Sequence, residues 1–241
     1  MAELESIDLE VGDLSEFATT STNGSNTLAA SATAALRGNY GLLLTFDGSS
    51  DEAYAISNTW TPVDEAWAAC HFQIPDGFTL PAWGDCRILG VHCAGFTAGG
   101  TSYEISVRNY SGDAAFPTHL RIIGPSIDQT VDVSLTADTE YWLGLHALSD
   151  ALVGGLAVEL EEVEVFSDFT VNTSVQDDIN SVIVGPIAVT SEPPNAATIW
   201  IDSIIVDDAD YPSEPAAGGG VVPTGALAGS LVGPLGGPIW R

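Results

Sequence analysis

The stretch TSYEISVRN, residues 101–109, decides the fold class, because every second residue in its centre is apolar. Tyr103, Ile105 and Val107 point the same way in an extended chain, and the residues between them are polar or charged. A period of two is typical of a strand with one face in the core and the other in solvent. We therefore expect a half-buried antiparallel strand here.

The same alternation recurs in GNYGLLLTF (38–46), AWAACHFQI (66–74), TVDVSLT (130–136), YWLGLHA (141–147), GGLAVEL (154–160) and ATIWIDSIIV (197–206). Turn-forming clusters separate these stretches, among them IPDGF (74–78) and NYSGDAAFP (109–117). The alanine-rich residues 25–38 are as compatible with a strand or loop as with a helix, because they lack helix caps. Many short strands separated by turns predict an all-β antiparallel sandwich.

The chain is strongly acidic. Its 241 residues include 5 Lys plus Arg, all of them Arg, against 33 Asp plus Glu, for a net charge of −28. This charge repels phosphate backbones and anionic lipids, so we expect neither nucleic-acid binding nor membrane attachment. The start, MAELESIDLEVGD, has neither the basic nor the apolar part of a secretory signal, which predicts synthesis without one. Three cysteines leave at least one unpaired, so we expect no disulfide framework.

The last 30 residues differ from the rest. After VDDADYPSEPAAGGG (206–220) the chain becomes uncharged apart from its final Arg, with glycine at every fourth position from 225. We predict a sandwich at 1–211, a Pro/Gly linker at 212–224 and an extended arm at 225–241. In an extended arm the aliphatic residues share one face, which suits docking on a neighbouring subunit. The predicted contact residues are Leu227, Leu231, Leu235, Ile239 and Trp240.

Four stretches carry a family resemblance: LEVGDLSEF (9–17), RGNYGLLLTFDGSSDEAY (37–54), TEYWLGLHAL (139–148) and WIDSIIVDD (200–208). Together they resemble the concanavalin A-like, laminin-G-like jelly-roll sandwiches, a fold also found in virion structural proteins of tailed phages and related viruses. Because one fold serves many functions, the resemblance implies an architecture and no particular activity.

The resemblance also implies a structural calcium ion that ties the first and last strands together. Carried over to this chain, the carboxylates would come from Glu10, Asp13, Asp202 and Asp208. Calcium takes 6–8 oxygen ligands, which suits clustered acids. The alternative is that these acids form part of a solvated acidic surface.

Catalytic motifs are weak. The run Glu159-Leu-Glu-Glu-Val-Glu164 approaches the carboxylate pattern of glucanases with this fold, but its spacing differs, and a strand–turn–strand break at Glu161–Glu162 explains it without chemistry. In each of the adjacent pairs Cys70–His71 and His92–Cys93, the two side chains point to opposite faces of the strand. Neither pair can therefore chelate a metal from one strand. Cys70 shares the face of Phe72 and Ile74, which predicts a core position.

A lectin-like role would need exposed aromatic rings, and Trp83 in PAWGD (81–85) is the strongest candidate because it lies at a predicted loop tip. The sequence thus predicts a non-enzymatic structural virion protein, either capsid decoration or tail-associated. It would be made in the host cytoplasm, assemble as a homo-oligomer through its arm and contact other particle proteins. The alternative is a carbohydrate-binding, lectin-like module that contacts surface glycans.

Overall fold

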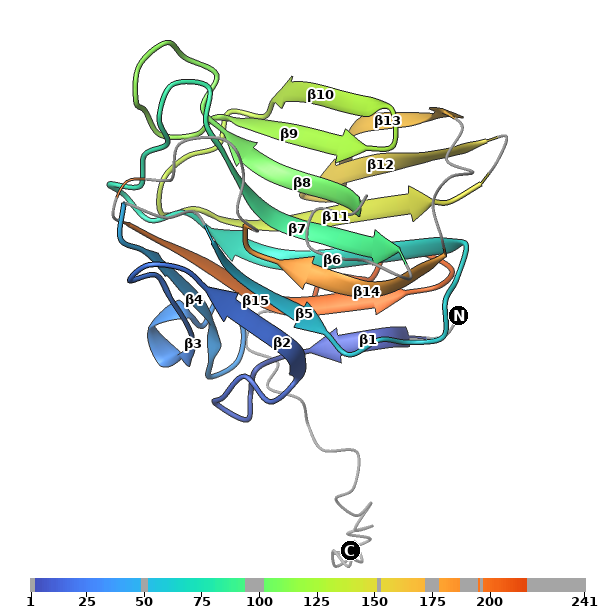
Figure 1. The fold of residues 1–241 in the computed structure, drawn as a ribbon, viewed down its shortest axis with the longest axis horizontal. Coiled ribbons are helices and arrows are strands. Elements are labelled where there is room, and N and C mark those ends of the chain that lie inside the picture. Colours follow the sequence, from blue (N-terminus) through green and yellow to red (C-terminus); the bar gives the residue numbers. More distant parts are fainter. Residues whose placement is uncertain are drawn as a thin grey trace, which may run out of the picture.

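The computed structural model describes residues 3–48, 52–93, 102–150, 153–171, 178–186, 195 and 197–215. Two antiparallel sheets pack face to face (Figure 1). Sheet A has the order β13 (Val163–Val171), β12 (Gly154–Leu160), β11 (Glu140–Leu148), β6 (Glu65–Gln73), β15 (Ala197–Asp207), β4 (Gly41–Phe46) and β3 (Thr27–Ser31), and β1 (Glu3–Ile7) also pairs with β15. Sheet B has the order β10 (Ile127–Asp132), β9 (His119–Gly124), β8 (Ser102–Arg108), β7 (Asp85–Cys93), β14 (Ile179–Val184), β5 (Ala53–Ser57) and β2 (Phe17–Thr22).

This arrangement confirms the predicted all-β jelly-roll sandwich. The quoted strand is β8, and Tyr103, Ile105 and Val107 are fully buried between the sheets. The alanine-rich stretch forms β3 and a short 3-10 turn at Ala32–Ala34 rather than an α-helix. No helix among the described residues is both long and apolar enough to cross a bilayer.

The alternation in β6 separates core from surface as predicted. Ala68, Cys70 and Phe72 face sheet B and are fully buried, which confirms the core position of Cys70. The side chains of Trp67 and His71, which alternate with these residues, face away from sheet B. The outer face of sheet A therefore carries side chains that are available for a site.

The break in the acidic run is also confirmed. Leu160 pairs with Val163, so Glu161 and Glu162 form a two-residue hairpin turn between β12 and β13. Both have positive φ, 54° and 60°, as a type I′ turn requires. Gly and Asn normally occupy such positions, because most other residues are strained at a positive φ.

A candidate site on the outer face of sheet A

Aromatic and imidazole rings gather on the outer face of sheet A, where β6 and β11 pair. His71 lies opposite Trp142, and Trp67 lies opposite His146. The Trp67 and His146 rings stack with centroids 4.2 Å apart and planes 10° from parallel. The His71 and Trp142 rings lie 4.6 Å apart. Register thus brings four rings into two cross-strand pairs on one face.

The chain after β15 crosses this same face. The Tyr211 ring lies over Gly144 of β11, where a Cβ atom would come within 2.9 Å of the ring. A glycine at 144 therefore makes room for Tyr211. Farther on, Glu214 Oε1 lies 2.7 Å from an Arg37 guanidinium nitrogen, and the Pro215 carbonyl accepts a hydrogen bond from Arg37 Nε. Residues 211–215 thus cover part of the outer face.

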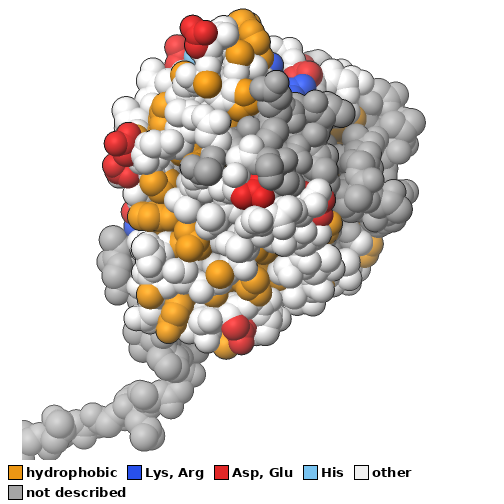
Figure 2. Space-filling model, turned by 60° about the vertical axis from the view of Figure 1, so that its left-hand side comes forward, with side chains coloured by type: hydrophobic (Ala, Val, Ile, Leu, Met, Phe, Trp, Pro, Cys, Tyr) orange, Lys and Arg blue, Asp and Glu red, His pale blue; other side chains and the backbone are white. Residues whose placement is uncertain are grey.

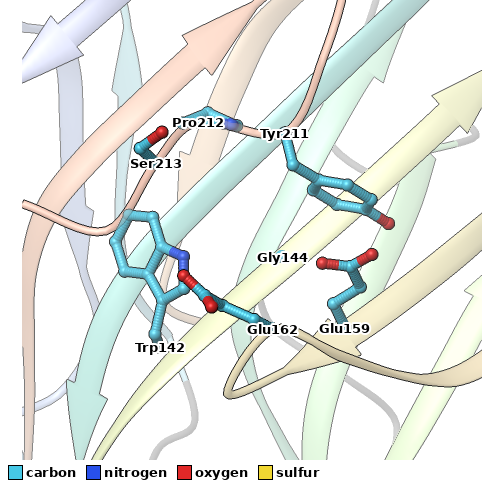
Figure 3. A pocket seen from close by; sticks show the side chains of 7 residues that line it. All are labelled: Trp142, Gly144, Glu159, Glu162, Tyr211, Pro212 and Ser213. Atoms are coloured by element: carbon cyan, nitrogen blue, oxygen red, sulfur yellow. The ribbon is translucent and has the colours of Figure 1, made fainter.

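A cavity of about 190 Å³ remains beside this crossing segment. It is smaller than the roughly 300–1,000 Å³ of drug-sized ligand sites, so it has room for a small group only. Figure 3 shows the Tyr211 hydroxyl directed at the Glu159 carboxylate, with Trp142 and Glu162 on the other side. The cavity is lined by Trp142, Gly144, Glu159, Glu162, Tyr211, Pro212 and Ser213.

Acidic side chains surround the cavity. Glu159 and Glu164 are directly opposed across β12 and β13, so they share a face, contrary to strict alternation through the run. Burial raises the pKa of Glu159, and the charges of Glu164, Glu162 and Asp210 raise it further. Within the described part of the chain, none of these four acids forms an ion pair with Arg or His. Glu159 therefore keeps its proton to a higher pH than an ordinary glutamate, as a proton donor requires.

Two neighbouring groups are held neutral. Burial raises the pKa of Tyr211, and the charges of Glu159 and Glu164 raise it further. Burial lowers the pKa of His146, and its hydrogen-bonding contact with Glu65 opposes this shift only in part. His146 Nε2 lies 2.8 Å from Glu65 Oε1, which fixes the ring beneath Tyr211.

A second polar cluster lies on the same face. Burial lowers the pKa of His71 to about 3, with a further contribution from the charge of Arg37. His71 Nδ1 is 2.8 Å from Glu140 Oε1, and that same carboxylate oxygen also accepts a hydrogen bond from Arg37. With Glu214 as a further partner, the Arg37 guanidinium is bound to carboxylates of its own chain.

The predicted calcium residues bind backbone amides. Glu10 Oε1 accepts a hydrogen bond from Asn39 N at 2.6 Å. Asp202 is fully buried and accepts hydrogen bonds from the amides of Leu36, Arg37 and Ser203 at 2.7–2.8 Å. Both carboxylates thus hold the loop between β3 and β4.

The other two predicted ligands do not complete a calcium site. Asp13 is exposed and accepts a hydrogen bond from Ser15 N, and Asp208 directly follows β15. No cluster of three or more potential metal ligands occurs in the described ranges. These residues therefore do not fit a calcium site as they stand, and calcium binding stays a prediction.

The remaining predicted site residues lie elsewhere. Trp83 is at a loop tip with half of its surface exposed, as expected. It directly precedes β7 of sheet B, whereas Glu159 of the cavity lies on β12 of sheet A. The predicted arm contacts, Leu227, Leu231, Leu235, Ile239 and Trp240, lie outside the described residues. The boundaries at 211 and 224 stay predictions.

Solved structures share this sandwich, although no protein-family model and no curated protein sequence matches the chain. An alginate lyase aligns with a TM-score of 0.64 at 12% identity over 87% of this chain and 98% of its own. A Trichoderma reesei endo-β-1,4-glucuronan lyase aligns at 0.60 and 13%, over 85% and 95%. The cellulose-induced protein Cip1 aligns at 0.58 and 14%, over 86% and 99%. At these identities the likeness establishes the fold.

These neighbours correct the functional prediction. The sequence favoured a non-enzymatic structural virion protein, either capsid decoration or tail-associated, but these three chains that share the sandwich are two polysaccharide lyases and a cellulose-induced protein. None of these three neighbours is described as a phage protein, and the concanavalin A-like sandwich is the part of the resemblance that they support. The expected virion location and homo-oligomer are not tested by these findings.

Proposed function

We propose that this protein binds a polysaccharide on the outer face of sheet A and cleaves its glycosidic bonds at the Tyr211 cavity. The observation that carries the proposal is Glu159, a part-buried carboxyl group with a raised pKa, in a small cavity between two aromatic side chains. The part-buried Tyr211 ring and the small exposed edge of Trp142 offer apolar surface to a sugar, and the carboxylates offer hydrogen-bond acceptors to its hydroxyl groups. That proteins with this sandwich act on polysaccharides supports the same class of substrate.

The cavity suits hydrolysis of a neutral glycan. Glu159 would donate its proton to the glycosidic oxygen as the bond from that oxygen to the anomeric carbon breaks. Glu162, on the other side of the cavity, would accept a proton from the water that adds to the anomeric carbon. The unpaired acids around the cavity repel a polyanion, which disfavours a uronate chain.

A second candidate is elimination from a uronate, the type of cleavage that a lyase performs. One observation favours it: Arg37 and the neutral His71 lie on the same face as Tyr211. Arg37 already binds the carboxylates of Glu140 and Glu214, so it could neutralise a sugar carboxylate only if these contacts were broken. Elimination would therefore require Arg37 to exchange its present partners for the sugar.

The products separate these functions. The protein is incubated with hydroxyethyl cellulose, xylan, alginate and polyglucuronate, and both new reducing ends and the ultraviolet absorbance of unsaturated sugars are followed. We expect reducing ends without unsaturated product from a neutral polysaccharide. Glu159→Gln should lower the rate by about 10²–10⁴-fold, because a positioned proton donor contributes that much.

Asp168→Asn is the matched control, since Asp168 lies on the same hairpin, is only part-buried and does not line the cavity. It should leave the rate unchanged. Unsaturated product from alginate or polyglucuronate would favour elimination instead. Full activity of Glu159→Gln, or no cleavage of any of the four polysaccharides, would reject hydrolysis at this site.

A further inference from the structure

Two exposed aromatic rings meet at the opposite layer of the sandwich, away from the Tyr211 cavity. Trp83, in the loop between β6 and β7, is 50% exposed, and Tyr110, in the loop between β8 and β9, is 52% exposed. Their ring centroids are 4.8 Å apart with the planes at 88°. The Tyr110 ring continues to His119 at 5.2 Å, and the Arg108 guanidinium carbon lies 6.0 Å from its centroid. The two exposed rings thus meet edge to face in an angled aromatic cluster, the Trp83–Tyr110 platform.

The backbone beneath Trp83 is strained. Gly84 N donates to the Pro81 carbonyl at 2.9 Å, which closes a four-residue turn with Trp83 at its third position. The φ of Trp83 is 61°, a value that this position of a type II turn demands and that glycine adopts without cost. Because a large aromatic residue stands where glycine is favoured, and half of it faces solvent, packing does not account for it.

A buried asparagine holds both loops in place. Asn109 is 2% exposed, and its side-chain amide lies within 3.0 Å of the carbonyls of Leu80, Pro81 and Asp113. Asn109 N also donates to the Gly84 carbonyl, and Trp83 N donates to the Ser111 carbonyl. These bonds join the two loops, so the rings are positioned before any ligand arrives.

We propose that the Trp83–Tyr110 platform is a second glycan-binding site, which holds a hydroxyl-rich sugar chain while cleavage takes place elsewhere. Sugar rings present apolar C–H faces that cover an aromatic ring, and hydroxyl groups that reach polar neighbours. The His119 and Arg108 side chains beside Tyr110 supply those polar neighbours. The choice of a glycan as the ligand rests on the proposed function, whereas the pre-positioned platform does not.

The turn itself allows a sharp test. Trp83→Gly removes the ring and relieves the strained φ, so we expect the melting temperature to stay the same or rise. Retardation of the protein in native gels that contain hydroxyethyl cellulose or xylan should weaken by roughly tenfold, the upper range for one aromatic contact. Tyr110→Ala should weaken it similarly. Val11→Ala, at another exposed apolar residue, is the control and should bind as the wild type does.

The outcomes separate this proposal from the proposed function. If Trp83→Gly lowers the melting temperature by several degrees, Trp83 is a packing residue and the platform is rejected. Equal retardation of wild type, Trp83→Gly and Tyr110→Ala, or no retardation of wild type, also rejects it. Loss of cleavage in Glu159→Gln with unchanged retardation supports two distinct sites. Retardation that depends on Trp83 in a protein that cleaves nothing would reject hydrolysis and keep the platform.

Discussion

Charged side chains are paired on the outer face of sheet B, whereas the acids around the cavity on sheet A are not. Sheet B carries three arginines, each within ion-pair distance of a carboxylate: Arg87 with Glu104, Arg108 with Asp85, and Arg121 with Asp85 and Asp128. Around the cavity of sheet A, none of the four acids forms an ion pair with an arginine that the structure describes, and burial together with the neighbouring charges raises the pKa of Glu159. On the face that Figure 2 shows, acidic side chains likewise outnumber basic ones. Balanced charge suits stability, whereas uncompensated charge around a cavity points to a chemical role.

The largest effect is expected on the balanced face. Arg87 and Glu104 are 8% and 13% exposed, and Arg87 Nε donates to Glu104 at 2.8 Å. Arg87→Met leaves the Glu104 charge buried without its partner, which should cost about 3–5 kcal/mol of unfolding free energy. Urea denaturation measures this. Polysaccharide cleavage should be unchanged below the unfolding temperature, and a selective loss of cleavage would show that the Arg87–Glu104 pair contributes to cleavage as well as to stability.

Asp202 on sheet A should show an intermediate, pH-dependent effect. Burial raises its pKa from 3.8 to about 6, against the lowering effect of the amides that it binds. The folded protein then binds this proton more tightly than the unfolded chain, so the contribution is fully present below about pH 4 and lost as the pH rises through about 6. The stability advantage of wild type over Asp202→Asn should be larger at about pH 4 than at about pH 7, by up to roughly 3 kcal/mol.

The same variant tests the calcium prediction. If the buried amides account for the role of Asp202, its loss should be equally destabilising in calcium and in a chelator. Thermal unfolding in both buffers measures this. A destabilisation that appears only with calcium would instead support a calcium ion near Glu10 and Asp202. In that case Asp202 would be a carboxylate of sheet A whose charge is balanced by a bound ion.

The smallest effect is expected at the strained turn. Glu162→Gly places glycine where φ is 60°, so it should raise the free energy of unfolding by up to about 1 kcal/mol. It should also reduce cleavage, because Glu162 lines the cavity. Thermal unfolding and the reducing-end assay measure the two effects. A more stable variant with full activity would show that Glu162 has no role in cleavage, and would contradict a functional role for the acids around the cavity.

The sequence was sufficient for the local features. Period-two patterns placed β6, β8, β11 and β12 and the burial of Cys70, because a strand's side chains alternate whatever its neighbours are. The break at Glu161–Glu162 and the exposed tip at Trp83 followed from the same local signals. The sandwich shows no complete catalytic motif in its sequence, so the functional prediction relied on the apolar residues 225–241. That prediction was wrong because the carboxylates of the cavity are brought together only by the fold.

Only the tertiary structure assembled the candidate site. Tyr211 comes from the chain after β15, Glu159 from β12 and Gly144 from β11. No spacing in the sequence links these three residues. Asp202 likewise meets the amides of Leu36 and Arg37, more than 160 residues away. Such contacts depend on the order of strands in a sheet and on the path of the chain across it, and both are set by non-local pairing. The sequence therefore determined which residues face outward, and the sheet order decided which of them meet.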